Sequence, residues 1–154
     1  MIRRWTVTGF LLAVFAVSCF GDAGAQGPKP IKIGFGMALT GGLAGNGQGA
    51  LLAMQIWKDD VNKAGGLLGR PVELVYYDDQ TNPATVPGIY SKLLDVDKVD
   101  LVVSGYGTNL IAPAMPIMIE RKLLFMGLFG LGNNQKHKYS RYFQIGRASC
   151  RERV

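Results

Sequence analysis

The side chains that could carry acid–base or metal chemistry are few and scattered along the chain. Asp78-Asp79 is a pair of carboxylates with no His or Cys nearby, which is more typical of a turn that ends a strand. His137 is the single histidine and lies in a polar stretch typical of a solvated loop. Gly34-x-Gly36 is a partial dinucleotide fingerprint, but Leu39 stands where the third glycine belongs. The sequence therefore predicts no cofactor and no metal site, and a nucleotide-dependent enzyme is the least favoured interpretation.

The first part of the chain has the composition of a targeting segment. Residues 1–25 contain Arg3-Arg4, an apolar run over residues 10–20 and then Ala23-Gly24-Ala25, the pattern of a cleaved secretory signal peptide. The apolar run is short for a membrane span, so an uncleaved anchor is the weaker alternative. Acylation of Cys19 is also less favoured, because the large aliphatic residue usual three positions before it is absent.

The last nine residues also differ from the rest. Residues 146–154 have no apolar period and resemble the translation of a sequencing adapter, so we expect a non-native tail; a basic disordered tail is the alternative. The formal net charge is +6, of which residues 1–25 contribute +1 and the tail +2, leaving +3. No basic stripe remains in the body, so nucleic acid is not an expected partner. Cys19 and Cys150 both lie in the ends, which leaves the body without thiols.

Strand-like and helix-like segments alternate between these ends. Apolar β-rich runs predict strands at 31–37, 72–77, 100–104 and 123–127, with a fifth starting at 142. Helical patterns are expected from about 48 to 63, from about 84, and over 110–121. The first helix should cover one broad apolar face with Leu51, Leu52, Met54, Ile56, Trp57 and Val61. The second should bury Val86, Ile89, Tyr90, Leu93 and Leu94. This alternation predicts an α/β fold: a three-layer, Rossmann-like parallel sheet with right-handed crossovers.

Ligands of such sheets bind beyond the carboxyl ends of the strands. The loops expected at that edge are 40–47, 78–83, 105–109 and 128–132, and three of the four are rich in glycine. Glycine allows a backbone N–H to approach a ligand closely. The sequence therefore predicts a small-molecule site at this edge.

Three segments, in this order, resemble the leucine/isoleucine/valine-binding protein family. They are Ile31-Lys32-Ile33-Gly34 with the following Leu39-Thr40-Gly41, the turn Asn62-Lys63-Ala64-Gly65-Gly66-Leu67-Leu68-Gly69, and the polar loop 78–83. This family comprises the periplasmic substrate-binding proteins of branched-chain amino-acid ABC transporters. The resemblance implies a type I periplasmic binding protein, whose incomplete first lobe would occupy residues 26–145. It further implies a second lobe that closes on the ligand, and we expect one lobe alone to bind weakly or not at all.

The resemblance also implies which residues contact the ligand. In that family, the loops after the third and fourth strands hold an α-carboxylate and an α-ammonium. Carried over by position, Thr108 would bind the carboxylate, with Tyr106 and Gly107 beside it. A hydroxyl and backbone N–H groups at a helix start are donors suited to an anion. The alternative is that Thr108 caps the helix expected to begin near Leu110.

The second contact loop departs from the family pattern. Branched-chain binders have small residues and a threonine there, whereas this chain has Phe129, Gly130 and Leu131 and no hydroxyl. These three are expected ligand contacts, while packing of Phe129 and Leu131 under the hinge is an equal alternative. Asn46 stands where the family often has an aromatic residue over the ligand. The departures leave the ligand open between a branched-chain amino acid and a different amino acid, an amide or an aromatic acid.

The resemblance implies a periplasmic, monomeric protein that captures a small-molecule ligand and delivers it to a membrane ABC permease. The same fold also serves as the sensor domain of membrane receptors, which is the alternative function. A downstream membrane helix would distinguish the receptor from the transporter component.

Overall fold

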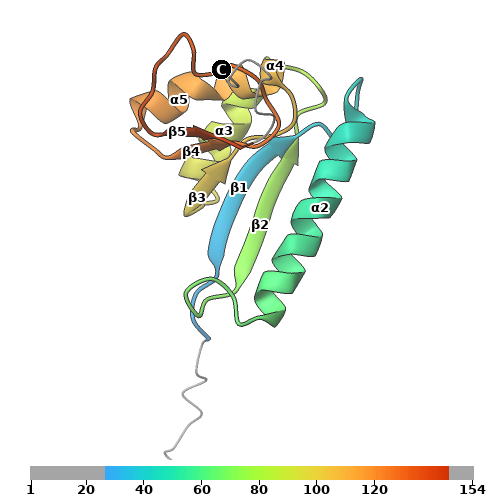
Figure 1. Ribbon diagram of the computed structural model, residues 1–154, viewed down its shortest axis with the longest axis vertical. Helices are drawn as coiled ribbons and strands as arrows, with labels where there is room; N and C mark the ends of the chain where they lie inside the picture. The colour runs from blue at the N-terminus through green and yellow to red at the C-terminus, as the bar shows by residue number, and fades with distance from the viewer. Residues whose placement is uncertain (1–26, 146–154) are drawn as a thin grey trace, which may run out of the picture.

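The computed structural model describes residues 27–145, so the predicted signal peptide, Cys19 and the predicted tail lie outside the described residues. Five parallel strands form one sheet in the order β2-β1-β3-β4-β5 (Figure 1). Their bounds are β1 Ile31–Met37, β2 Val72–Asp78, β3 Leu101–Val103, β4 Phe125–Gly127 and β5 Tyr142–Gln144. Each strand falls within two residues of its predicted start, because each is a local apolar run between turn residues.

Helices lie on both faces of the sheet, which confirms the three-layer α/β prediction. α2 (Ala44–Lys63) packs on β1 and β2, and α3 (Val86–Asp95) packs on the opposite face of these strands (Figure 1). The prediction of one helix over 110–121 is wrong. The segment is divided into α4 (Thr108–Ile111), the 3-10 helix η1 (Ala112–Ala114) and α5 (Met115–Glu120). Pro113 and Pro116 each stand near the start of a new piece, where a missing N–H costs least.

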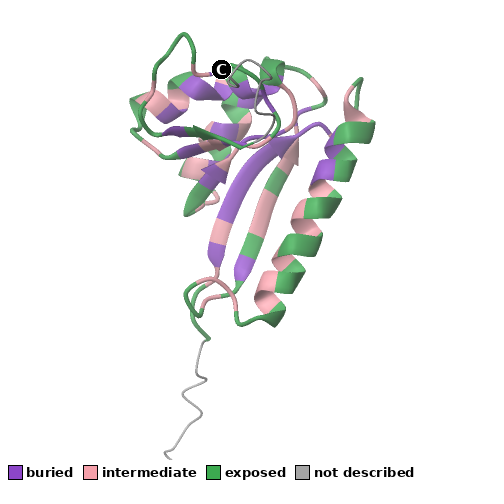
Figure 2. Ribbon diagram, viewed as in Figure 1, coloured by how far each residue is buried: buried purple, intermediate pink, exposed green. Residues whose placement is uncertain are grey.

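The main core lies between the sheet and the α3–α5 layer. Val86, Tyr90 and Leu93 are buried and Ile89 and Leu94 are half-buried, as predicted for the second helix. Tyr90 meets Phe125 edge to face with ring centroids 5.8 Å apart. Figure 2 shows β1 as an almost continuously buried strand and buried residues along the inner sides of the helices in this layer.

The first glycine of the Gly34-x-Gly36 motif serves this same packing. A Cβ at Gly34 would lie 2.9 Å from the Val99 side chain, and one at Gly36 would lie 3.5 Å from Ile89. Close approach of the helical layer to β1 therefore accounts for the first glycine. A Cβ at Gly36 would make only an ordinary van der Waals contact, so packing explains the first glycine of the motif and not the second.

The broad apolar face predicted for the first helix is only partly correct. Leu51, Met54 and Val61 are half-buried, but Leu52, Ile56 and Trp57 are 57%, 53% and 41% exposed. α2 covers β1 and β2 but leaves this face of β3 and β4 bare. The result is an apolar hollow of about 430 Å³, lined by Ile33, Ala53, Met54, Trp57, Leu67, Leu101, Val103, Met126 and Leu128. Trp57 is exposed because it borders this hollow.

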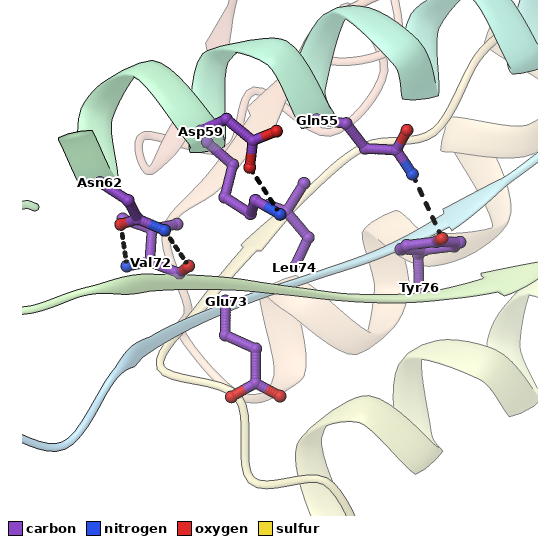
Figure 3. A pocket seen from close by; sticks show the side chains of 8 residues that line it. Gln55, Asp59, Asn62, Val72, Glu73, Leu74 and Tyr76 are labelled. Carbon is purple, nitrogen blue, oxygen red and sulfur yellow. Dashed lines mark hydrogen bonds and ion pairs between the residues drawn. The ribbon is translucent and has the colours of Figure 1, made fainter.

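The turn between α2 and β2 is fixed by the side chain of Asn62. Its amide Nδ2 donates to the Val72 carbonyl at 2.9 Å, and its Oδ1 accepts the Val72 N–H at 2.7 Å (Figure 3). Gly66 has a φ of 80°, and a Cβ there would lie 2.0 Å from the Arg70 carbonyl oxygen. The Asn-x-x-Gly-Gly motif therefore sets the start of β2 beside the end of α2.

Candidate functional site

At the carboxyl edge of the sheet, Asp78 holds the loop after β1 in place. Its Oδ1 accepts the N–H groups of Leu39, Thr40 and Gln80 at 3.0, 3.2 and 2.8 Å, and its Oδ2 accepts the Thr40 hydroxyl at 2.6 Å. Desolvation acts to raise the pKa of Asp78, but these hydrogen bonds, led by that of Thr40, lower the pKa below its usual value. Both oxygens of the carboxylate therefore hold the loop after β1 in place.

Asp79 is directed into the protein. It is 1% exposed and its Oδ1 accepts the Thr81 N–H at 2.9 Å. Burial raises the pKa of Asp79, with a smaller contribution from the neighbouring Asp78 charge, against the lowering effect of the Thr81 bond. Both carboxylates belong to the turn that ends β2, which confirms the interpretation from sequence.

Asn46, Tyr106 and Phe129 come together from three separate segments. The Asn46 amide in the first turn of α2 donates to the Tyr106 hydroxyl at 3.0 Å. The rings of Tyr106 and Phe129 stack with centroids 5.5 Å apart and an interplanar angle of 29°. The expectation of a loop through Gly47 is wrong, because α2 begins at Ala44 and therefore carries Asn46 on a helix.

The loops after β3 and β4 are tied together by three further bonds. The Gly107 N–H donates to the Phe129 carbonyl at 3.2 Å. The Leu131 N–H donates to the Thr108 hydroxyl at 3.0 Å, and that hydroxyl donates to the Leu131 carbonyl at 3.5 Å. Thr108 is the first residue of α4, and no side chain caps this helix, so the helix-cap alternative is wrong. Its hydroxyl instead joins the two loops.

Gly130 does not share this surface. It is buried, and a Cβ there would lie 2.3 Å from the Asn133 amide nitrogen and 2.5 Å from the Ile111 side chain. Asn133 is itself 8% exposed, with neither amide atom hydrogen-bonded. Gly130 therefore packs beneath the loop, and the other six predicted residues form the cluster: Asn46, Tyr106, Gly107, Thr108, Phe129 and Leu131.

Ser104 was not predicted from the sequence. It is fully buried at the end of β3, where its hydroxyl accepts the Leu128 N–H at 2.8 Å and donates to the Gly105 carbonyl at 3.1 Å. The bond from the Leu128 N–H fixes the start of the loop after β4. A lone serine that ends an apolar strand is the only sequence signal for it.

A second hollow lies away from the carboxyl-edge loops, between α2 and the edge strand β2. It measures about 360 Å³ and is lined by polar side chains together with Val72 and Leu74. Gln55 donates to the Tyr76 hydroxyl at 3.4 Å, and Lys58 pairs with Asp59 at 2.9 Å (Figure 3). The first of these contacts joins α2 to β2, and the second is an ion pair within α2, so these polar groups already have partners in the lobe. The carboxyl-edge cluster is therefore the candidate site.

Two features were sought among the described residues and not found. Among residues 27–145, no three His, Cys, Asp or Glu side chains are grouped so as to hold a metal ion. No helix in this part of the chain is both long and apolar enough to cross a membrane.

A parallel sheet with helices on both faces defines the doubly wound α/β class. In this class, ligands bind at the carboxyl edge of the sheet, where the loops after β3 and β4 are joined here. The chain belongs to the periplasmic binding protein family, since the family model described as "Periplasmic binding protein" matches residues 30–149. An "Amino acid binding protein" of Pseudomonas aeruginosa is 30% identical over an alignment of 91 residues that covers 54% of this chain and 24% of that protein.

Solved structures agree with this assignment. The branched-chain amino acid transporter substrate binding protein LivJ of Streptococcus pneumoniae, in complex with isoleucine, is 26% identical with a TM-score of 0.68. A putative branched-chain amino acid ABC transporter of Silicibacter pomeroyi is 27% identical with a TM-score of 0.64. Each match covers 75% of this chain but only 33% and 31%, respectively, of the other chain. The chain thus spans about a third of the length of these relatives.

Proposed function

We propose that this chain is part of the extracytoplasmic solute-binding component of an ABC importer. The lobe would hold an amino acid or a related small polar ligand at the Asn46–Leu131 cluster while a second lobe closes over it. A membrane permease would then receive the ligand, and the protein would act as a monomer exported by the signal peptide in residues 1–25. Family membership and the similarity to amino-acid-binding relatives support this proposal.

The observation that carries the proposal is the joining of the first turn of α2 to the loops after β3 and β4, at the edge where ligands of such sheets bind. Neutral donors and acceptors are gathered there on Asn46, Tyr106 and Thr108. Hydrogen bonds between the loops fix these groups before a ligand arrives, which lowers the entropic cost of binding.

Thermal unfolding of the protein expressed from its complete reading frame would test the proposal. A library of amino acids, amides and small organic acids should include compounds that raise Tm, because binding to the folded state stabilises it. Thr108→Val should weaken the effect of the best compound, and Thr108→Ser, which keeps the hydroxyl, should retain it. A rise in Tm with nucleotides or metal ions alone would contradict a solute-binding function.

A further inference from the structure

The stacked rings of Tyr106 and Phe129 are the largest apolar feature of the candidate site. Tyr106 packs against the apolar cluster around Phe35, Met37 and Ala50, and its hydroxyl accepts the Asn46 amide. Phe129 stacks on Tyr106 and is 39% exposed. The inner ring is therefore fixed by packing and a hydrogen bond, and the outer ring is open to solvent.

We infer that this stack selects a ligand that carries a flat aromatic ring, and that the ring binds on Phe129. The inference rests on the solute-binding function proposed above and specifies its substrate class. Paired aromatic rings attract each other beyond the effect of buried area alone. Because Tyr106 already orients Phe129, little side-chain freedom is lost when a third ring is added.

The charges around the stack are compatible with this class of ligand. The segments 38–47, 104–109 and 127–135, which surround the stack, contain no Lys, Arg, His, Asp or Glu. Both carboxylate oxygens of Asp78 are occupied by the loop after β1, and Asp79 is 1% exposed. An α-ammonium group finds no free carboxylate at this edge among the described residues. Charge at this edge therefore does not distinguish one amino acid from another, whereas an aromatic side chain or ring gains Phe129 as a stacking partner.

Two matched ligand pairs test the inference on the protein from the complete reading frame. Benzoate is compared with cyclohexanecarboxylate, and phenylalanine with cyclohexylalanine, by isothermal titration calorimetry. Each pair differs only in whether the ring is aromatic. In the pair that binds, the aromatic member should bind roughly three- to tenfold more tightly. Equal or weaker binding of the aromatic member would overturn the inference.

A substitution pair then assigns the preference to the stack. Phe129→Leu keeps apolar bulk but removes the ring, so the aromatic preference should disappear. Phe143→Leu is the matched control, because Phe143 is 55% exposed on β5 and outside the cluster. Persistence of the preference in Phe129→Leu, or its loss in Phe143→Leu, would refute the assignment to Phe129.

The outcomes separate this inference from the function on which it rests. Binding of isoleucine with no binding of either aromatic compound would overturn ring selection and leave solute binding intact. Failure of every small solute in the library would contradict the proposed function itself. The comparison on the unmodified protein decides ring selection even if a variant does not fold.

Discussion

Replacing Gly47 or Gly49 of α2 by alanine should change the stability of the fold in opposite directions. Gly47 is buried, and a Cβ there would lie 1.9 Å from the carbonyl oxygen of Ala38, just beyond β1. Gly49 is exposed, and a Cβ there would meet nothing within 4 Å. Gly47→Ala must displace helix or loop backbone by about 1 Å to reach even the 3.0 Å that real Cβ atoms respect. Backbone on both sides leaves no flexible side chain to move aside.

The magnitude follows from two opposing effects. Alanine favours a helix over glycine by about 1 kcal/mol, and forced overpacking costs about 1–3 kcal/mol or more. Gly49→Ala should therefore stabilise the fold by up to about 1 kcal/mol, while Gly47→Ala should destabilise it by about 1–2 kcal/mol. At about 4–8 °C per kcal/mol, Tm should rise by a few degrees in the first variant and fall by roughly 5–15 °C in the second.

Circular dichroism at 222 nm during heating provides the assay for both variants and the unmodified protein. Displacement of α2 also moves Asn46 from Tyr106, so Gly47→Ala should weaken ligand binding while Gly49→Ala leaves it unchanged. If Gly47→Ala raised Tm as much as Gly49→Ala, the close approach of α2 to Ala38 would be wrong.

Three further predictions follow from other contacts. Ser104→Ala deprives the Leu128 N–H of its acceptor and should destabilise the fold by about 1–3 kcal/mol in urea unfolding, whereas the exposed Ser140→Ala should change little. Because the folded-state pKa of Asp78 is lowered, its carboxylate stabilises the fold at pH values above the ordinary pKa of an aspartate. This contribution is lost as the pH falls through the lowered pKa. Asp78→Asn should therefore lose more stability at pH 7 than at pH 3, and the reverse order would contradict the hydrogen-bond assignment. The bare hollow beside α2 should bind the dye ANS in the 154-residue chain; Leu101→Ser should reduce this fluorescence and Leu68→Ser, at a site 94% exposed and outside the hollow, should not.

The strands could be predicted from the sequence because each is encoded locally. β1 and β2 are apolar runs bounded by Gly, Pro or Asp, and their order along the chain leaves few parallel arrangements. The start of α2 could not be predicted in this way. Gly45, Gly47 and Gly49 are typical of a loop, and only the approach of Gly47 to Ala38 explains a glycine within the helix.

The candidate site shows the same division between local and non-local information. The loops that carry it follow from the parallel order of the strands. Asn46 and Tyr106 are 60 residues apart, and their hydrogen bond depends on where the first turn of α2 is placed. Gly130 stays a prediction, because glycine in a loop is equally compatible with a ligand contact and with packing, and here Asn133 and Ile111 occupy the space beside it.

Thr108 can join the loops and still serve a ligand in the proposed complex. Its hydroxyl oxygen accepts the Leu131 N–H at 3.0 Å, a bond that uses a lone pair of the oxygen and does not involve the hydroxyl proton. The proton is directed to the Leu131 carbonyl at 3.5 Å, which is the outer limit of a hydrogen bond and contributes little. An anionic ligand could therefore accept a hydrogen bond from the Thr108 hydroxyl at small cost, while the bond from the Leu131 N–H to the hydroxyl oxygen remains. The lobe thus offers exchangeable neutral donors in place of fixed charges, and under the proposed ring selection the aromatic surface of Tyr106 and Phe129 supplies the preference between ligands.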